Sequence, residues 1–357
     1  MKRAMAMGLG FGALAAALAV GLVTGCGSLG YVAQSTSGHL GLAASAKPVS
    51  KWLEDDKTPE NLRERLALSQ RMRDFAVSEL GLPDNRSYRS YADLKRPYAV
   101  WNVVAAPELS LQLRTWCFPV FGCAGYRGYF TIDEADALGD QLRAEGMEVS
   151  VYGVPAYSTL GWTDMLGGDP LLNTFIFHPE GELARLIFHE LAHQVVYVKD
   201  DTQFNESFAT AVERIGAGRW LALHASAAAR AQYEQLDSRR RAFKQLTRQT
   251  REQLDALYRS DAADAVKRER KAALMAQMRA DYERLKTEQW GGYAGYDAWF
   301  AHANNATLGV QGAYDDLVPQ FERLYEREGR DFARFYAAVK RVAALPKPER
   351  DATLRTM

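Results

Sequence analysis

The sequence predicts a predominantly helical α+β fold with a small sheet and an inserted, long antiparallel helical hairpin. Short segments rich in Val, Tyr, Phe and Trp at residues 98–106, 126–132 and 148–157 indicate strands. From residue 181 onward, apolar residues recur at helical spacing instead. The stretch 220–290 contains no Gly or Pro and carries apolar residues at near-heptad spacing, which favours a pair of long packed helices.

The N-terminal 25 residues have the layout of a bacterial lipoprotein signal peptide. Lys2-Arg3 precedes an apolar run that is too short and too rich in Gly and Ala for a convincing membrane span. Val23-Thr24-Gly25-Cys26 resembles a lipobox, in which Cys26 is lipidated and becomes the new N-terminus. Several acyl chains on Cys26 would hold the chain firmly at a membrane. The alternative is a plain secretory signal with a coincidental Cys.

These features predict a protein of the bacterial cell envelope that is lipid-anchored and faces the periplasm. Gly27, rather than Asp, follows the lipobox Cys, which favours the outer membrane over the inner one. Export also bears on Cys117 and Cys123, which enclose a short loop. In an oxidising compartment we expect these two residues to form a disulfide.

Charge and length exclude some classes of function. The chain has 44 basic and 44 acidic residues, and removal of residues 1–25 takes away only Lys2 and Arg3 among them. A net charge near −2 gives no general attraction to nucleic acid, and we expect no nucleic-acid partner. The remaining chain is long enough for a large core, as one elaborated domain or two lobes.

Taken in order, the elements begin with a tether and a first loose helix at 26–57. The main core is expected at 58–219. Its first helix opens with Thr58 as N-cap, Pro59 at the first helical position and Glu60 in the first turn, and it runs to Gly81. A further short strand is predicted at 174–177.

The segment 187–194 carries the most specific motif, because it reads HExxH within an apolar helical pattern that extends from residue 181 to 198. His189 and His193 are four residues apart, so both imidazoles lie on one face of a helix and can bind one metal ion. Glu190 stands beside that face and can accept a proton from a metal-bound water. The alternative is a surface helix with two solvated His.

A catalytic zinc site needs a third protein ligand. Asp200-Asp201-Thr202 can end the first helix and start a second one, expected to run to about Ile215, before Gly216 and Gly218. Glu206 on this second helix would lie level with the His pair, an arrangement that resembles the gluzincin metallopeptidases. The rival ligands are His178, Asp200 and Asp201.

One position departs from the gluzincin pattern. The acid that commonly follows four residues after the ligand Glu is replaced here by Thr210. Glu213 could supply a carboxylate behind the ligands instead, or it could be an ordinary solvated side chain.

The stretch 220–290 is predicted to form the helical hairpin, with its turn at Ser260-Asp261. Its many Arg and Glu residues suggest a solvated face, and a protein-binding arm or a lid is the alternative. Residues 291–357 are expected to complete the core with helices, using Trp299, Phe300, Phe321 and Phe335.

The resemblance extends beyond HExxH. Over almost the whole mature chain, the sequence resembles a family of bacterial lipoproteins described as predicted aminopeptidases, through segments that occur in the same order. These segments are Leu82–Asn85, Ser87–Tyr88 with Tyr91, Val100–Val103, Ala105–Ser110, Trp116–Val120 with Gly122–Cys123, Tyr126–Phe130, Ala156–Trp162, Ile187–Gln194, Phe204–Ala209 and Asn304–Ala306.

The resemblance implies a zincin-like metallopeptidase core, peptide-bond hydrolysis, and His189, His193 and Glu206 as ligands of a zinc cofactor. Such zinc would lower the pKa of its water toward about 7, and Glu190 would accept the proton and pass it to the leaving amine. A strand leading into the motif helix suits a peptidase, because an edge strand can bind a substrate backbone. Tyr157 is the favoured donor to the oxyanion.

Alternatives remain at two levels. Tyr314 and His302 are further candidates for the oxyanion donor, and Glu108, Asp164 and Asp169 are candidates for binding the free amine of a substrate. An endopeptidase acting on misfolded envelope proteins would use the same four zinc-site residues. A non-enzymatic lipoprotein would instead use the 220–290 hairpin to bind a protein partner and zinc as a structural ion.

Overall fold

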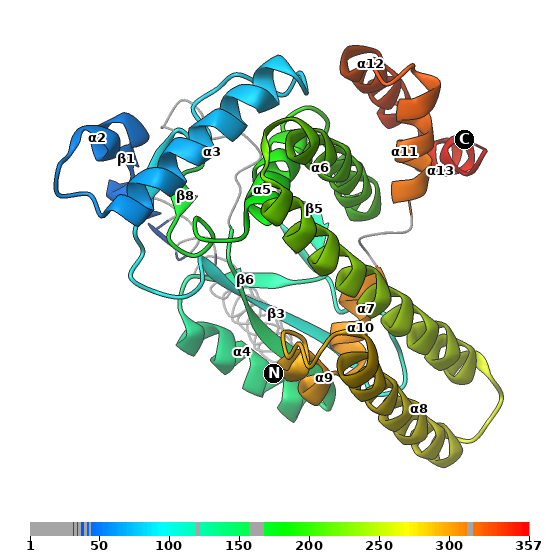
Figure 1. The fold of residues 1–357 in the computed structure, drawn as a ribbon. Helices are drawn as coiled ribbons and strands as arrows, with labels where there is room; N and C mark the ends of the chain where they lie inside the picture. The colour runs from blue at the N-terminus through cyan, green and yellow to red at the C-terminus, as the bar shows by residue number, and fades with distance from the viewer. Residues whose placement is uncertain are drawn as a thin grey trace, which may run out of the picture.

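A computed structural model of the chain is predominantly helical with small sheets, which confirms the coarse fold prediction (Figure 1). The structure describes residues 46–118, 122–156, 168–312 and 317–356, together with single residues between 31 and 45. The signal peptide and Cys26 therefore lie outside the described residues. Among the described helices, none combines the length and the apolar character needed to cross a membrane.

The first sheet joins segments that are far apart in the sequence. It has the order β1-β2-β8, from Lys47–Pro48, Ser90–Ala92 and Leu171–Leu172. Next to it lie α2 (Val49–Glu54) and α3 (Glu60–Ser78). Pro59 takes the N-cap position of α3, so the predicted start at Thr58 was one residue early.

The predicted strand at 174–177 is wrong. The strand lies earlier, at Leu171–Leu172, and residues 173–177 form turns in which the N–H groups of Phe175 and Ile176 both donate to the carbonyl of Leu172. Phe175 and Ile176 are buried in the main core. The apolar run thus reflects burial of a turn rather than strand pairing.

The second sheet is antiparallel with the order β6-β3-β7, from Arg127–Tyr129, Val100–Pro107 and Met147–Val154. These three strands confirm the predictions at 126–132, 98–106 and 148–157. Helix α4 (Ile132–Ala144) covers one face through Ala135 and Leu142, and α10 (Asn305–Gly312) covers the other through Ala306. Helix α4 was not predicted, although Asp133 and Glu134 in its first turn are a helix-start signal.

A third, two-stranded sheet carries the predicted disulfide. Strands β4 (Trp116–Phe118) and β5 (Gly122–Ala124) pair so that Cys117 lies opposite Cys123, and the two are disulfide-bonded. The backbone N–H of Cys123 donates to Asp200 Oδ1 at 3.0 Å. This small hairpin is therefore tied to the loop that follows the HExxH helix.

Helices α5 (Glu180–Ala192) and α6 (Thr202–His224) form the centre of the main core, where their buried apolar side chains meet. Helix α5 ends six residues before the predicted Val198. Helix α6 continues past the predicted end near Ile215, because Gly216 is a site of close packing rather than a break. An added Cβ there would lie 2.7 Å from Leu80 Cδ1 and 3.0 Å from Phe188 Cδ2.

The helical hairpin exists as predicted, with α7 (Ala227–Arg259) and α8 (Asp264–Arg284) joined at residues 260–263 (Figure 1). After it come a short π-helix (Leu285–Gln289), α9 (Asp297–His302) and α10 (Asn305–Gly312). The hairpin and α9 share a core of their own, which includes Phe243, Tyr282 and Phe300. Because α6 continues to His224, the hairpin itself begins at residue 227 rather than 220.

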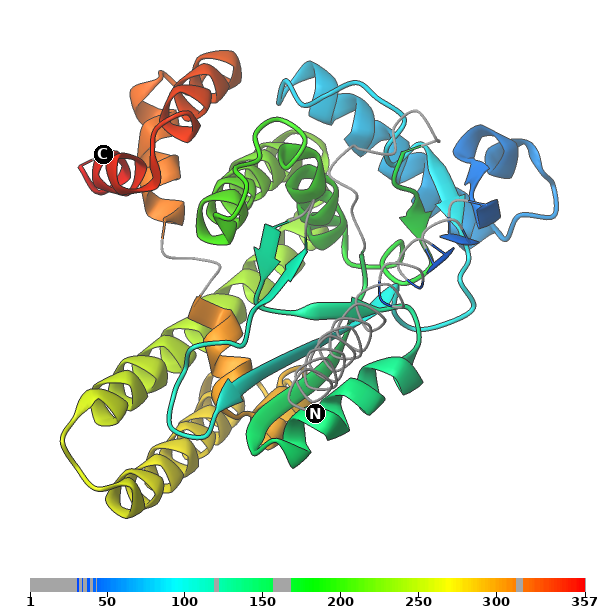
Figure 2. The ribbon, with the colours of Figure 1, turned by 180° about the vertical axis from the view of Figure 1, so that it is seen from behind.

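Three C-terminal helices complete the main core, seen in orange and red in Figure 2. They are α11 (Val318–Arg327), α12 (Phe332–Ala343) and α13 (Lys347–Arg355). As expected, Phe321 and Phe335 are buried in the core, where both contact Phe208 of α6. From α13, buried Arg350 donates to Asp201 Oδ2 at 2.6 and 3.0 Å.

Candidate metal centre

The two helices α5 and α6 and the loop between them bring the predicted ligands together. His189 lies in the last turn of α5, His193 is the C-cap of that helix, and Glu206 lies in the second turn of α6. Asp200 adopts a left-handed conformation with φ of 61°, which Asp tolerates better than most residues and which turns the chain back. The Asn205 side chain then accepts from the N–H of Val198 at 2.8 Å and donates to its carbonyl at 2.7 Å.

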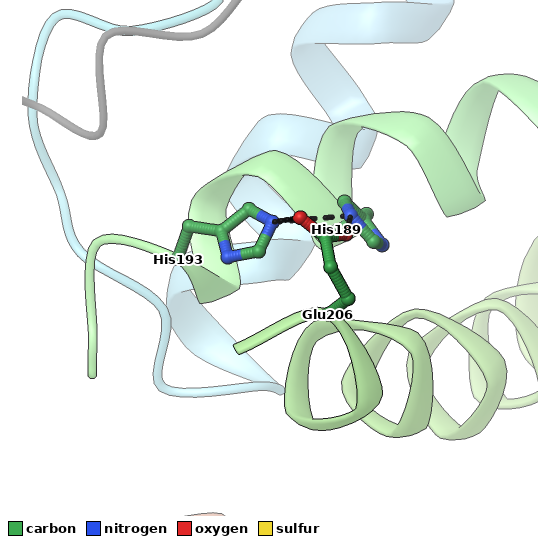
Figure 3. Close-up of side chains that lie close together, drawn as sticks. All are labelled: His189, His193 and Glu206. Carbon is green, nitrogen blue, oxygen red and sulfur yellow. Dashed lines mark hydrogen bonds and ion pairs between the residues drawn. The ribbon is translucent and has the colours of Figure 1, made fainter. Parts of the chain in front are cut away.

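The three side chains point toward one another (Figure 3). His189 Nε2 lies 3.3 Å from Glu206 Oε2, and His193 Nε2 lies 3.7 Å from Glu206 Oε1. The two Nε2 atoms are 3.1 Å apart. One possible ligand atom from each of the three residues lies within 4.8 Å of the other two. The three atoms are therefore close enough to bind a single metal ion.

Each protonation state follows from burial and neighbouring charge. Burial lowers the pKa of His193 to about 4, so this ring is neutral at pH 7. Burial also favours neutral His189, but its contacts with Glu206 and Glu213 outweigh this effect and raise its pKa well above the ordinary value. Burial alone would raise the pKa of Glu206, but its bond to His189 lowers it. The carboxylates of Glu206 and Glu213 thus favour a positive charge at His189, which lies between them.

The sequence left open whether Glu213 is solvated or supports the ligands. In the structure its side chain is buried and contacts His189 on the side away from the site. The residue is 8% exposed, and its Oε2 lies 2.9 Å from His189 Nδ1. This contact fixes the ring so that Nε2 faces the site. Burial would raise the pKa of Glu213, but the charge of Arg185 and the contact with His189 lower it to about 2.

Arg185, which the sequence analysis did not single out, connects this site to the helical hairpin. It is 9% exposed and pairs with Glu213. On its other side, Arg185 Nη1 lies 4.0 Å from Glu182 Oε2, and Arg240 of α7 lies 2.6 Å from the same Glu182 oxygen. A row of alternating charges therefore runs from His189 to the hairpin.

The loop at 82–88, part of the family-like segments, supports the end of α5. Asn85 Nδ2 donates to Gln194 Oε1 at 2.5 Å, and Gln194 Nε2 donates to Ser87 Oγ at 3.2 Å. Fully buried Arg73 of α3 holds this loop through the carbonyls of Pro83 and Ser87. These contacts position the residue that follows His193.

The donor set fits zinc. Zinc in proteins is bound by His nitrogens and carboxylate oxygens, and a catalytic site supplies three such ligands. Here two Nε2 atoms approach each other closely, an arrangement that requires either a proton or a cation between them. The carboxylate of Glu206 would offset part of the charge of a divalent ion, whereas the charge of Glu213 is already paired with Arg185.

The rival ligands lie elsewhere. Asp201 is the N-cap of α6 and pairs with Arg350, whereas Asp200 accepts from Cys123. His178 precedes the opposite end of α5, where its carbonyl accepts from Arg65. Thr210 is buried on α6. Among the described residues, the His189, His193 and Glu206 group is the one metal-ligand cluster of its kind.

The structure describes the predicted general base, Glu190, but not the predicted oxyanion donor, Tyr157. Glu190 is half-buried on α5, and its charge contributes to raising the pKa of His189, after the effects of burial, Glu206 and Glu213. Tyr157 lies outside the described residues, as do Tyr314 and Asp164. His302 is exposed on α9, a helix that packs with the hairpin.

Of the candidates for binding a substrate amine, the structure describes Glu108 and Asp169. Glu108 pairs with Arg268 of α8 at 2.9 Å. Asp169 is buried, and its backbone bonds to Ser87 and Tyr88. Two tyrosines that were not predicted as site residues, Tyr126 and Tyr197, interact with its charge. The pKa of each hydroxyl is raised by local desolvation and by the negative charge of Glu206, although the two residues are 39% and 49% exposed.

A helix pair that places two His and one Glu around one point, with a carboxylate next to the first His, defines a candidate metal centre of the HExxH type. The chain belongs to the protein family described as "Putative aminopeptidase", whose model matches residues 30–354. No curated protein and no solved structure shows significant similarity to the chain. Membership of the family supports a peptidase.

Proposed function

We propose that this protein is a zinc-dependent aminopeptidase that is anchored as a lipoprotein and acts on peptides in the periplasm. The observation that carries the proposal is the convergence of His189, His193 and Glu206, with Glu190 directly following His189 in the chain. A structural zinc site has no need of a general base. The presence of Glu190 therefore favours a hydrolase over a non-enzymatic scaffold with structural zinc.

The residues divide the work as follows. His189, His193 and Glu206 would hold the ion, with Glu213 fixing the orientation of the His189 ring. When bound, zinc would supply a Lewis acid that lowers the pKa of a water and offsets negative charge in the transition state. Glu190 would accept a proton from the attacking water and give it to the leaving amine. Tyr157 remains the proposed oxyanion donor.

The decisive experiment uses the soluble chain that begins after Cys26. Its zinc content is measured by elemental analysis, and its cleavage of a mixed peptide library is compared with that of Glu190→Gln and a surface control, Glu326→Gln. We expect about one zinc per chain in all three proteins. Cleavage should fall by about 10²–10⁴-fold in Glu190→Gln alone, because only this change removes the general base.

The products decide between the two peptidase alternatives. Trimming from free N-termini supports the aminopeptidase, whereas internal cuts also in peptides with blocked N-termini support an envelope endopeptidase. Full activity of a zinc-loaded Glu190→Gln protein would contradict the proposed mechanism. Zinc without cleavage, combined with a protein partner that binds the 220–290 hairpin equally well in Glu190→Gln, would favour the scaffold.

A further inference from the structure

One face of α5 carries the two His of the candidate metal centre and, in line with them, two charged side chains. His193, His189, Arg185 and Glu182 follow one another at spacings of four, four and three residues. Such spacings place side chains on one face of a helix, one above the other. The face that presents the proposed ligands therefore continues toward the N-terminus of α5 as a pair of opposite charges.

Helix α7 of the hairpin packs directly on this part of α5 (Figure 1). A Cβ added to Gly181 would lie 2.4 Å from Cδ2 of the Tyr233 ring, so this contact needs a residue without a side chain. About two turns further along α7, Arg240 Nη2 lies 2.6 Å from Glu182 Oε2, and both residues are half-buried. The hairpin thus supplies the cation that pairs with Glu182.

Arg185 lies between two carboxylates and bonds to one of them. Its Nη2 atom pairs with Glu213, whereas its Nη1 atom lies 4.0 Å from Glu182 Oε2, beyond hydrogen-bond distance. Among the described residues, Arg185 Nε, Arg185 Nη1 and Glu182 Oε1 are buried without a hydrogen-bond partner. Because such groups cost free energy, Glu182 and Glu213 compete for one guanidinium. Arg240 binds the Glu182 oxygen that faces Arg185.

The result of this competition reaches the metal centre because Glu213 orients a proposed ligand. Glu213 Oε2 lies 2.9 Å from His189 Nδ1. If Arg185 turned to Glu182, the buried carboxylate of Glu213 would lose its cation, and a buried charge without its partner is costly. Glu213 would then have to shift or take up a proton. Either change would alter its contact with His189.

We propose that Arg240 of the hairpin is a positioning residue of the metal centre, which holds Glu182 so that Arg185 stays with Glu213. This inference rests on the zinc-binding part of the proposed function and does not require peptide cleavage. It gives the hairpin a role that differs from a solvated face and from a partner-binding arm. Its competitor is a purely structural role, in which the same ion pair only fastens the hairpin to α5.

The test compares zinc affinities of the full chain purified in detergent, measured by competition against a chelator of known affinity. Arg240→Met removes the charge, and Arg240→Lys keeps it. The double variant Arg240→Met with Glu182→Gln also removes the charge that competes for Arg185. Arg241→Met is the matched control, because Arg241 is the next residue of α7, pairs with Asp237 and has a side chain that is 63% exposed. Thermal melting of the metal-free proteins shows whether each variant is folded.

We expect Arg240→Met to weaken zinc binding about three- to tenfold, because Arg240 acts on the ligand through three other side chains. Arg240→Lys and Arg241→Met should bind zinc as the parent does. The double variant should return to within about twofold of the parent, since Arg185 then stays with Glu213. This recovery separates the two roles. A purely structural role predicts that the double variant, which lacks both charges of the ion pair, binds zinc no better than Arg240→Met.

The inference is wrong if a folded Arg240→Met protein has the zinc affinity of the parent, or if the double variant binds as weakly as Arg240→Met. Should Arg240→Met not fold, Arg240→Gln takes its place with the same expected results. A parent that binds zinc but cleaves no peptide overturns the proposed peptidase and leaves the role of Arg240 to be decided by these affinities. A parent that binds no zinc overturns both.

Discussion

His189 has a carboxylate near each ring nitrogen, with Glu206 next to Nε2 and Glu213 next to Nδ1. Glu213 is in turn paired with buried Arg185. These contacts at both ring nitrogens favour the orientation in which Nε2 faces the metal position.

We predict that Glu213→Gln lowers zinc affinity by about 10–100-fold, because the variant loses the charge that orients His189 and balances Arg185. Competition against a chelator of known affinity measures this change. Glu326→Gln, which removes a carboxylate from an exposed pair with Arg330, is the control. A folded Glu213→Gln protein with the zinc affinity of the parent would show that Glu213 has no role in holding the ligand.

At the residue scale, the sequence predicted the proposed ligands but not the buried residues, Glu213 and Arg185, that support His189. His189, Glu190 and His193 are fixed by spacing within one helix, and Glu206 follows from a short turn between two helices. Whether Glu213 is solvated or buried depends on how α6 packs against α5. That packing has no local signature, so the roles of Glu213 and Arg185 required the structure.

Among the elements, α6 depends on a contact between distant parts of the chain. Asp201 caps its N-terminus by accepting from the N–H of Phe204 at 3.2 Å, and it also pairs with Arg350 of α13. Asp331 caps α12 in the same way, through the N–H of Arg334 at 2.8 Å, but is exposed. The two caps differ mainly in the buried ion pair.

We predict that Asp201→Asn destabilises the protein by about 3 kcal/mol, because it leaves Arg350 buried without its charge partner. Asp331→Asn should be nearly neutral, since Asn and Asp are equally good N-caps. Urea unfolding measures both, as a shift of the midpoint at constant slope. Equal midpoint shifts would mean that the ion pair adds nothing to the cap.

The bounds of the helices and strands show which features local sequence signals can predict and which depend on tertiary packing. The hairpin was predicted well, because its apolar spacing and its turn at Ser260 are local. The end of α6 was misplaced, because Gly216 looks like a helix terminator although it permits close packing with Leu80 and Phe188. The strand at 174–177 was misplaced because burial and strand pairing produce the same apolar run.

At the scale of the whole molecule, Asn304 and Asn305 join the hairpin to the second sheet, which has the order β6-β3-β7. Buried Asn305 donates to the carbonyls of Pro107 and Glu108 and accepts from Tyr258 of α7 at 2.8 Å. Asn304 donates to the carbonyl of Val149 in β7 at 3.0 Å. The hairpin's apolar stripe is largely covered by α9 and its neighbours, so a protein partner at the hairpin, which stays a prediction, would have to use the charged faces.

Attachment to the membrane is a prediction about the whole protein. We predict that Cys26→Ser moves the full-length chain from the membrane fraction to the soluble fraction, because the acyl chains have no other attachment point at the lipobox. Immunoblotting of the two fractions measures this, and Cys117→Ser with Cys123→Ser is the control that keeps Cys26. A Cys26→Ser chain that stays with the membrane would contradict lipid anchoring.

The short loop between α5 and α6 also bears on the order of folding. All three proposed ligands lie within residues 189–206, so bringing them together closes only a short loop, at small entropic cost. The bond between Gln34 and Gly128 and the pair between Asp201 and Arg350 instead join residues roughly 100 or more positions apart. We therefore expect a newly synthesised chain to be able to bind metal before these long-range contacts have formed.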